Sequence, residues 1–364
     1  ITRIHDIQGD GAAPPLIGQR STVQAVVTAN FLDTLGGFFL QEEDADADDN
    51  LATSEGVFVF AGDASIDLDF DALIDVGDLV TLTGSVSEFF DKTQISAISA
   101  IEVGDPVAEL PSAAEITFPV AVVEDEDGAL LADLEAFEGM RVTFPQELTV
   151  GDVFNLGRFG EIDLNALGRL PAFTQTNAPD VDGFDAFKRE AAANAILLDD
   201  GSGAQNPDFI PFEIAGQPGA VAGQLDAEDE LGSGDTVTGL TGVLDFGFSQ
   251  YRVQPTASED YGIGLPEFVN ATPRAATPPE VGGELTVTAF NVLNYFTTLD
   301  QDGNTTGPDA QQPRGADNLP EFERQTAKIV AALTEIEADI LGLIEIENEF
   351  IDINGDGLIA IQFL

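Results

Sequence analysis

Apolar and polar residues alternate over short stretches through the first 103 residues, which is the period-two pattern of half-buried strands. Turn-rich or acidic segments separate five such stretches. The predicted strands are 21–28, 37–41, 56–60, 79–89 and 93–101. Five short strands with one long, curved member favour a small barrel of the OB type, so residues 1–103 are predicted to form one all-β domain.

A second all-β domain is predicted at 118–261, after a proline-containing linker at 104–117. Its strand patterns are 141–144, 148–155, 195–198, 236–244 and 251–254. The segment 234–244 repeats the pattern of 77–86, which favours a second, elaborated OB-like barrel. The longer irregular stretch 173–189 is predicted to be an exposed loop.

The pattern changes in 284–364, which follows a second, proline-rich linker at 262–283. An alternating strand pattern at 285–296 is followed by apolar residues at helical spacing in 318–336 and by an apolar run at 340–347. This order predicts a strand, a helix and a strand. The predicted fold is therefore mainly β, with two OB-like β-barrel modules followed by a β-α-β portion.

Two polar side chains end the strands of this β-α-β portion. Strands joined by a helix normally lie parallel, with a right-handed crossover. Their C-terminal ends then share one rim of the sheet, where ligands bind in such folds, so Asn291 and Glu345 are expected to lie side by side. An amide and a carboxylate suit a hard divalent cation such as Mg²⁺. The alternative is a buried strand-end Asn and an exposed strand-end Glu without a ligand.

The net charge of the chain indicates the kind of environment in which the protein works. The chain has 66 acidic and 13 basic residues, a formal net charge of −53. Such an imbalance repels nucleic acid, anionic membranes and other parts of the chain unless salt screens it, which favours a marine or halophilic source over an ordinary acidic protein. The chain has no cysteine, so disulfides contribute nothing, and no apolar run is long enough to span a membrane.

Several motifs in 284–364 resemble the opening of the endonuclease/exonuclease/phosphatase superfamily, and more closely the secreted bacterial endonucleases of the ExeM/NucH type. The motifs are 290–296 (FNVLNYF), 314–317 (RGAD), 321–325 (EFERQ) and 342–348 (GLIEIEN). The resemblance implies an α/β sandwich of that superfamily in which Asn291 and Glu345 are metal ligands of a phosphodiesterase site. It also implies Mg²⁺ or Mn²⁺ as cofactor, extracellular DNA or RNA as substrate, and secretion or a cell-surface location.

The chain departs from that superfamily in its histidines. The superfamily completes its site with two histidines and further Asp and Asn residues in a second half, whereas the single histidine here is His5, near the other end of the sequence. The chain as given is therefore expected to be an inactive part of a longer nuclease. The alternative function is a non-catalytic extracellular surface or matrix protein built of β-modules.

The first domain resembles the YhcR-type OB domain that precedes the nuclease domain in the same endonucleases. OB barrels often hold single strands on aromatic side chains beside basic groups. The residues that would supply such a face are Phe39, Phe58, Phe89, Arg20 and Lys92. The alternative is a structural barrel, because strand alternation sends half of the aromatic residues inward and basic residues are few. In the second domain, Arg158, Arg169 and Arg252 are expected either to meet phosphates or to pair with carboxylates of their own domain.

Two loops of the last domain carry candidate calcium ligands. Asp352, Asn354 and Asp356 occupy positions 1, 3 and 5 of an EF-hand-like loop, but position 12 is Phe363 rather than a carboxylate. A second loop has similar chemistry with poorer spacing, and its candidate ligands are Asp300, Asp302 and Asn304. The alternative for both loops is an ordinary turn.

Overall fold

The computed structural model describes the chain except for residues 49, 63–73, 126, 208–209, 211–212, 215–230, 272, 274, 276, 302, 308 and 348–364. The chain divides into two compact units, Ile1–Pro273 and Arg274–Leu364. Strands hold 38% of the residues and helices 15%, so the protein is mainly β, as predicted. No helix among the described residues is long and apolar enough to cross a membrane.

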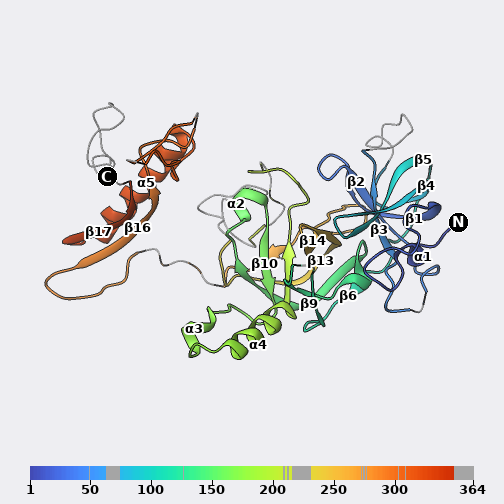
Figure 1. Ribbon diagram of the computed structural model, residues 1–364, viewed down its shortest axis with the longest axis horizontal. Helices are drawn as coiled ribbons and strands as arrows, with labels where there is room; N and C mark the ends of the chain where they lie inside the picture. The colour runs from blue at the N-terminus through green and yellow to red at the C-terminus, as the bar shows by residue number, and fades with distance from the viewer. Residues whose placement is uncertain are drawn as a thin grey trace. The chain divides into compact units, whose positions relative to one another are not determined.

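The first unit begins with a closed barrel whose strands follow the order β1-β2-β3-β5-β4 (Figure 1). The strands are β1 (Arg20–Phe31), β2 (Gly37–Gln41), β3 (Gly56–Phe60), β4 (Asp78–Phe89) and β5 (Lys92–Pro106). Neighbouring strands are antiparallel except β3 and β5, which are parallel. A short helix, α1 (Ile4–Gln8), adds the fully buried Ile4 and Ile7 to the barrel core. The alternation pattern predicted the five strands. It did not predict α1, because a helix of five residues is too short to show a helical period.

The rest of the first unit holds a six-stranded sheet with the order β10-β11-β14-β13-β9-β6. Its strands are β6 (Ala114–Glu115), β9 (Arg141–Asp152), β10 (Ile162–Asn165), β11 (Ala195–Leu198), β13 (Thr236–Gly247) and β14 (Gln250–Gln254). An additional pairing of β10 with β9 joins the two sides of the sheet, so five strands form a ring, β9-β10-β11-β14-β13. If the ring strands are numbered 1 to 5 along the chain, their order in the ring is 1-2-3-5-4, the same as in the barrel. The third and fifth strands, β11 and β14, are again parallel.

The predicted internal repeat falls on the fourth strand of the barrel and of the ring, β4 and β13. Each strand is preceded by a left-handed glycine, Gly77 with φ 99° and Gly234 with φ 104°. Their N–H groups donate to equivalent carbonyls of the first strand, Val27 and Val150, both at 2.8 Å. Residues with a Cβ rarely adopt this backbone conformation, which explains why glycine stands at both positions.

The barrel and the ring pack against each other within the first unit. Ala29, Phe39 and Phe58 of the barrel form one buried cluster with Val243 of β13. The predicted linker at 104–117 therefore lies inside a compact unit, whereas the division between the two units falls in the predicted linker at 262–283.

Shorter elements decorate the first unit. They are β7 (Val122–Glu124), β8 (Leu130–Ala132), η1 (Glu135–Phe137), α2 (Leu156–Phe159), α3 (Phe173–Thr176), α4 (Val181–Ala192), β12 (Glu213–Ile214) and β15 (Glu267–Phe268). The prediction of a loop at 173–189 is wrong, because α3 and most of α4 lie there. Asp180 caps α4 by accepting a hydrogen bond from the Gly183 N–H at 3.0 Å.

The second unit has the predicted strand, helix and strand. They are β16 (Val287–Tyr295), α5 (Leu319–Ile336) and β17 (Ile340–Ile346). The strands are parallel, and α5 covers one face of the pair (Figure 1). Asn318 caps α5 by accepting from the Glu321 N–H at 3.0 Å, and Glu321 accepts from the Asp317 N–H at 2.9 Å, a reciprocal arrangement that fixes where the helix begins.

Candidate functional site

The C-terminal ends of β16 and β17 bring the two predicted site residues together. Asn291 is paired with Ile344, so Glu345 follows directly beside it. The Asn291 Nδ2 donates a hydrogen bond to Glu345 Oε1 at 2.7 Å. Both side chains are exposed. The juxtaposition expected from the parallel strands is therefore present at the rim of the pair.

The backbone around this pair is held in sparsely populated conformations. Leu293, Asn294 and Glu345 have φ angles of 55°, 51° and 66°, and the strand register shifts between Asn291 and Tyr295. Left-handed backbone is unfavourable for residues with a Cβ and costs about 1 kcal/mol or more each. Such conformations persist where the surrounding structure holds them, and they gather at functional sites.

The hydrogen bonds of Asn291 define what each group at the rim can do. Asn291 Oδ1 accepts from the Leu293 N–H at 2.8 Å, so its amide NH₂ must face Glu345. Among the described residues, Oε1 is the Glu345 oxygen that accepts a hydrogen bond. The arrangement therefore orients the Glu345 carboxylate, with the Asn291 amide on Oε1.

Glu347, two residues further along, has a structural task that the sequence did not reveal. Its carboxylate accepts hydrogen bonds from Thr297 N at 2.8 Å, from Thr297 Oγ1 at 2.9 Å, from Thr298 N at 3.2 Å and from Thr306 Oγ1. Burial raises the pKa of Glu347, but the donors from the threonines outweigh it and hold the pKa below its usual range. This carboxylate fixes the loop after β16. The sequence carries no local signal for this role, because the threonine donors lie some fifty residues before Glu347.

The candidate calcium ligands are only partly described. Asp302, Asp352, Asn354 and Asp356 lie outside the described residues. Asp300 accepts hydrogen bonds from Gln312 Nε2 at 3.1 and 3.0 Å, and the Asn304 Nδ2 donates to the Leu299 carbonyl at 3.1 Å. Asp300 and Asn304 therefore bind groups of their own unit.

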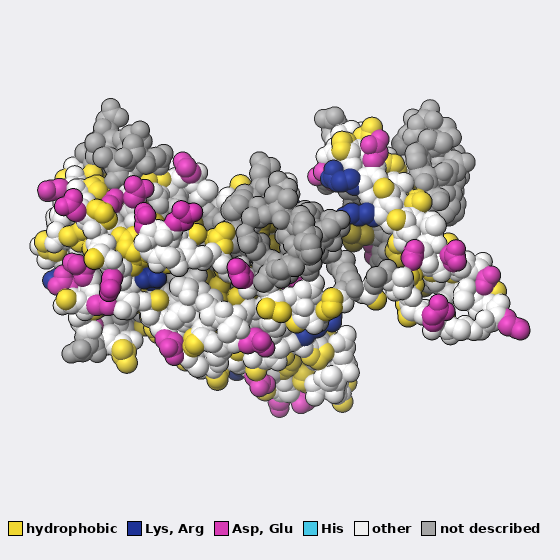
Figure 2. Space-filling view, turned by 180° about the vertical axis from the view of Figure 1, so that it is seen from behind, with side chains coloured by type: hydrophobic (Ala, Val, Ile, Leu, Met, Phe, Trp, Pro, Cys, Tyr) yellow, Lys and Arg dark blue, Asp and Glu magenta, His cyan; other side chains and the backbone are white. Residues whose placement is uncertain are grey.

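The predicted nucleic-acid face does not form an exposed surface. Phe39 and Phe58 are buried in the junction with the ring, and Lys92 lies 4.2 Å above the Phe58 ring while pairing with Asp245 at 3.0 Å. Both side chains face away from the barrel core, where strands of the second sheet cover them. Phe89 is 56% exposed, and Arg20 donates to Ser99 Oγ at 2.7 Å. Figure 2 shows Asp and Glu side chains spread over the first unit, with few Lys or Arg.

A buried charge network crosses the ring. Arg252 Nη1 donates to Asp199 Oδ2 at 2.7 Å and to Glu161 Oε1 at 2.8 Å. Of the two expectations for Arg252, pairing within its own domain is the one observed. Burial raises the pKa of the adjacent Asp200 to about 7, and the charge of Asp199 adds to the shift.

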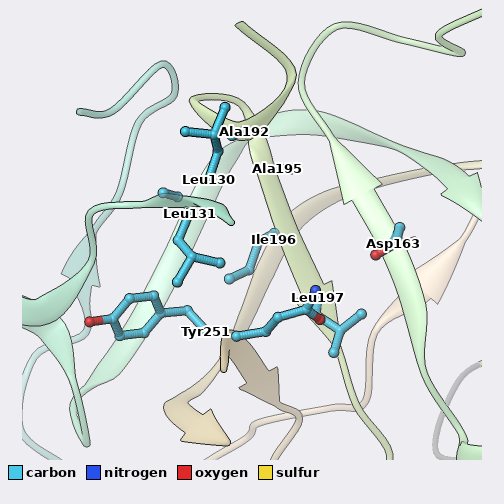
Figure 3. A pocket seen from close by; sticks show the side chains of 10 residues that line it. Leu130, Leu131, Asp163, Ala192, Ala195, Ile196, Leu197 and Tyr251 are labelled. Atoms are coloured by element: carbon cyan, nitrogen blue, oxygen red, sulfur yellow. The ribbon is translucent and has the colours of Figure 1, made fainter. Parts of the chain in front are cut away.

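The first unit has a cluster of possible metal ligands and a small pocket. His5, Asp48 and Glu55 bring potential ligand atoms within 4.8 Å of one another, and His5 Nδ1 lies 2.9 Å from Glu55 Oε2. A pocket of about 100 Å³ lies between Leu131 of β8 and Ile196 of β11 (Figure 3). The pocket is smaller than ordinary ligand sites. In the cluster, His5 and Glu55 form a hydrogen bond with each other.

One family model matches part of the chain. It is described as a domain of unknown function (DUF8508) and covers residues 131–264. This range includes all five strands of the ring and less than half of the chain. No curated protein and no solved structure matches the chain.

Proposed function

We propose that the second unit belongs to a divalent-metal-dependent phosphodiesterase domain, and that the protein acts as a secreted or cell-surface nuclease on extracellular DNA or RNA. The observation that carries the proposal is the contact between Asn291 and Glu345 at the shared rim of parallel strands. The sequence motifs around both residues support it independently.

In this proposal Glu345 holds Mg²⁺ or Mn²⁺ through Oε2, and Asn291 orients the carboxylate through its amide N–H. The bound ion would supply Lewis-acid polarisation of a phosphate oxygen. Calcium at the two loops of this unit stays a prediction.

The surface of the strand pair supports the α/β-sandwich part of the proposal. Val287, Ile340 and Ile344 are 68%, 51% and 52% exposed on the strands. Parallel strands are normally covered on both faces. An apolar exposed surface opposite α5 suits a strand pair that belongs to a layered α/β fold.

For the barrel and the ring of the first unit we propose OB-type folds with a structural role. Their common strand order, with parallel third and fifth strands, supports the fold. The burial of Phe39 and Phe58 in their junction supports the role, because aromatic rings covered by protein cannot stack on bases.

Paramagnetic Mn²⁺ tests the metal site in the full chain. In about 1 M NaCl, where nonspecific attraction is screened, Mn²⁺ should broaden the NMR signals of Asn291 and Glu345 before those of other acidic residues. Glu345→Gln should remove this selective broadening. Glu335→Gln, an exposed change on α5, should leave it intact. Equal broadening in wild type and Glu345→Gln would refute the site.

A further inference from the structure

The bulge that ends β16 is held from outside the strand. After Asn291, the chain passes through Val292, which is 2% exposed, and Leu293, which is 74% exposed. The left-handed backbone at Leu293 and Asn294 turns the carbonyls of 292 and 293 away from the strand ladder. A strand that leaves its ladder needs other partners for these groups.

Gln325 of α5 supplies those partners. Its Nε2 donates to the Val292 carbonyl at 3.1 Å and to the Leu293 carbonyl at 2.7 Å. Both acceptors are carbonyl oxygens, so the amide nitrogen must be the atom that faces them. One side chain of the helix therefore fixes two consecutive peptide groups of the bulge.

The same bulge sets the direction of Asn291. The Leu293 N–H donates to Asn291 Oδ1 at 2.8 Å, and the Asn291 Nδ2 donates to Glu345 Oε1 at 2.7 Å. Gln325, the bulge, Asn291 and Glu345 thus form a continuous series of hydrogen bonds. Gln325 stands at its start and does not touch the position of a cation.

We infer that Gln325 is a positioning residue for the Glu345 carboxylate, acting through the bulge and Asn291. The inference rests on the proposed function, since it concerns the same site. Without the Gln325 donor, two carbonyls lose their partner, the peptide at Leu293 is free to rotate, and Asn291 loses the N–H that holds its amide. Glu345 would then lose its orientation.

The test replaces Gln325 by Met, which has a similar length and no donor. In the full chain, Gln325→Met should weaken Mn²⁺ binding about tenfold, the usual effect of losing an outer-shell contact. It should also shift the side-chain amide signals of Asn291. Ala331→Met places the same side chain on an exposed position of α5 and should change neither reading.

Gln325→Glu separates positioning from loss of fold. When protonated, this side chain can donate one hydrogen bond. The Asn291 amide signals should therefore approach those of wild type at the same pH as pH falls, a comparison that cancels the protonation of Glu345 and Glu347 common to both proteins. No such return is expected for Gln325→Met. If the Asn291 signals do not move in Gln325→Met, the inference is overturned. If Gln325→Met instead unfolds the unit, the inference is overturned when Gln325→Glu shows no pH-dependent return of these signals. If wild type binds no Mn²⁺, the proposed function fails, while the Asn291 signals still decide whether Gln325 positions that side chain.

Discussion

Glu138 in the first unit and Glu347 in the second are both buried, with 2% and 5% of their surface exposed, yet their pKa values shift in opposite directions. Glu138 accepts one backbone hydrogen bond, from Thr93 at 2.9 Å, and its Oε2 has no partner among the described residues. Burial, followed by the charge of Glu135, raises its pKa well above the usual range. Glu347 is surrounded by threonine donors. Burial raises the pKa of both carboxyls, and the supply of hydrogen-bond donors decides whether that rise is offset.

The difference follows from how each unit is built. In the first unit, acidic side chains meet where the barrel packs on the ring, and Lys92 is the cation beside Glu138 and Asp245. In the second unit, the Glu347 carboxylate accepts hydrogen bonds from threonines of the loop after β16. Mutations should therefore affect the two units in different and sometimes opposite ways.

The largest effect is expected at the aromatic junction of the first unit. Phe39→Ala should lower the free energy of unfolding by about 3–4 kcal/mol, because a fully buried ring is replaced by a cavity. Phe89→Ala, at an exposed hairpin tip, should cost less than about 1 kcal/mol. Urea unfolding of the two variants measures this, and equal losses would mean that the junction does not stabilise the unit.

The next effect concerns Glu347. Glu347→Gln should destabilise the second unit by about 2 kcal/mol, since hydrogen bonds to a charged acceptor are stronger than those to an amide. Because the folded pKa is lowered, the stabilisation is present above the unfolded pKa and is lost as pH falls through the folded pKa. Hydrogen exchange of the β16 and β17 amides between pH 3 and 7 measures both the destabilisation and its pH dependence, with Glu335→Gln as control. An unchanged pH profile would contradict the role of the carboxylate.

Glu138→Gln should act with the opposite sign. The raised pKa of Glu138 means that its contribution is present below the unfolded pKa and is lost as pH rises toward the folded pKa. The substitution should therefore change little near pH 4 and stabilise the first unit at pH 8 by at least about 1 kcal/mol, the cost of an unpaired buried acceptor. Denaturant midpoints at the two pH values test it. Destabilisation at pH 8 would break the contrast with Glu347.

The smallest and most general effect is that of salt. A net charge of −53 opposes compaction when it is unscreened. The melting temperature should rise between about 10 mM and 1 M NaCl, over which the Debye length falls to a few ångströms. A flat profile would remove the argument for a saline habitat.

Patterns of neighbouring residues in the sequence predicted the barrel strands and α5. Alternation predicted the five barrel strands, and the Asn318 cap with its helical spacing predicted α5. Parallel pairing then predicted the meeting of Asn291 and Glu345. The junction was not predictable in this way, because alternation shows that one of Phe38 and Phe39 faces out of the barrel core, but neither which one nor that another sheet covers it. The same holds for Glu347, whose partners are supplied by a loop some fifty residues earlier.

Among the described residues, β16 and β17 pair with each other and with no third strand, so their outer edges have no described strand partner, unlike the strands of the closed barrel. Free edges beside apolar side chains are templates for strand addition by another molecule. At low ionic strength, mutual repulsion keeps copies of the chain apart. Concentrated salt removes that protection while tightening the fold, so aggregation in a saline preparation is expected to begin at the edges of β16 and β17.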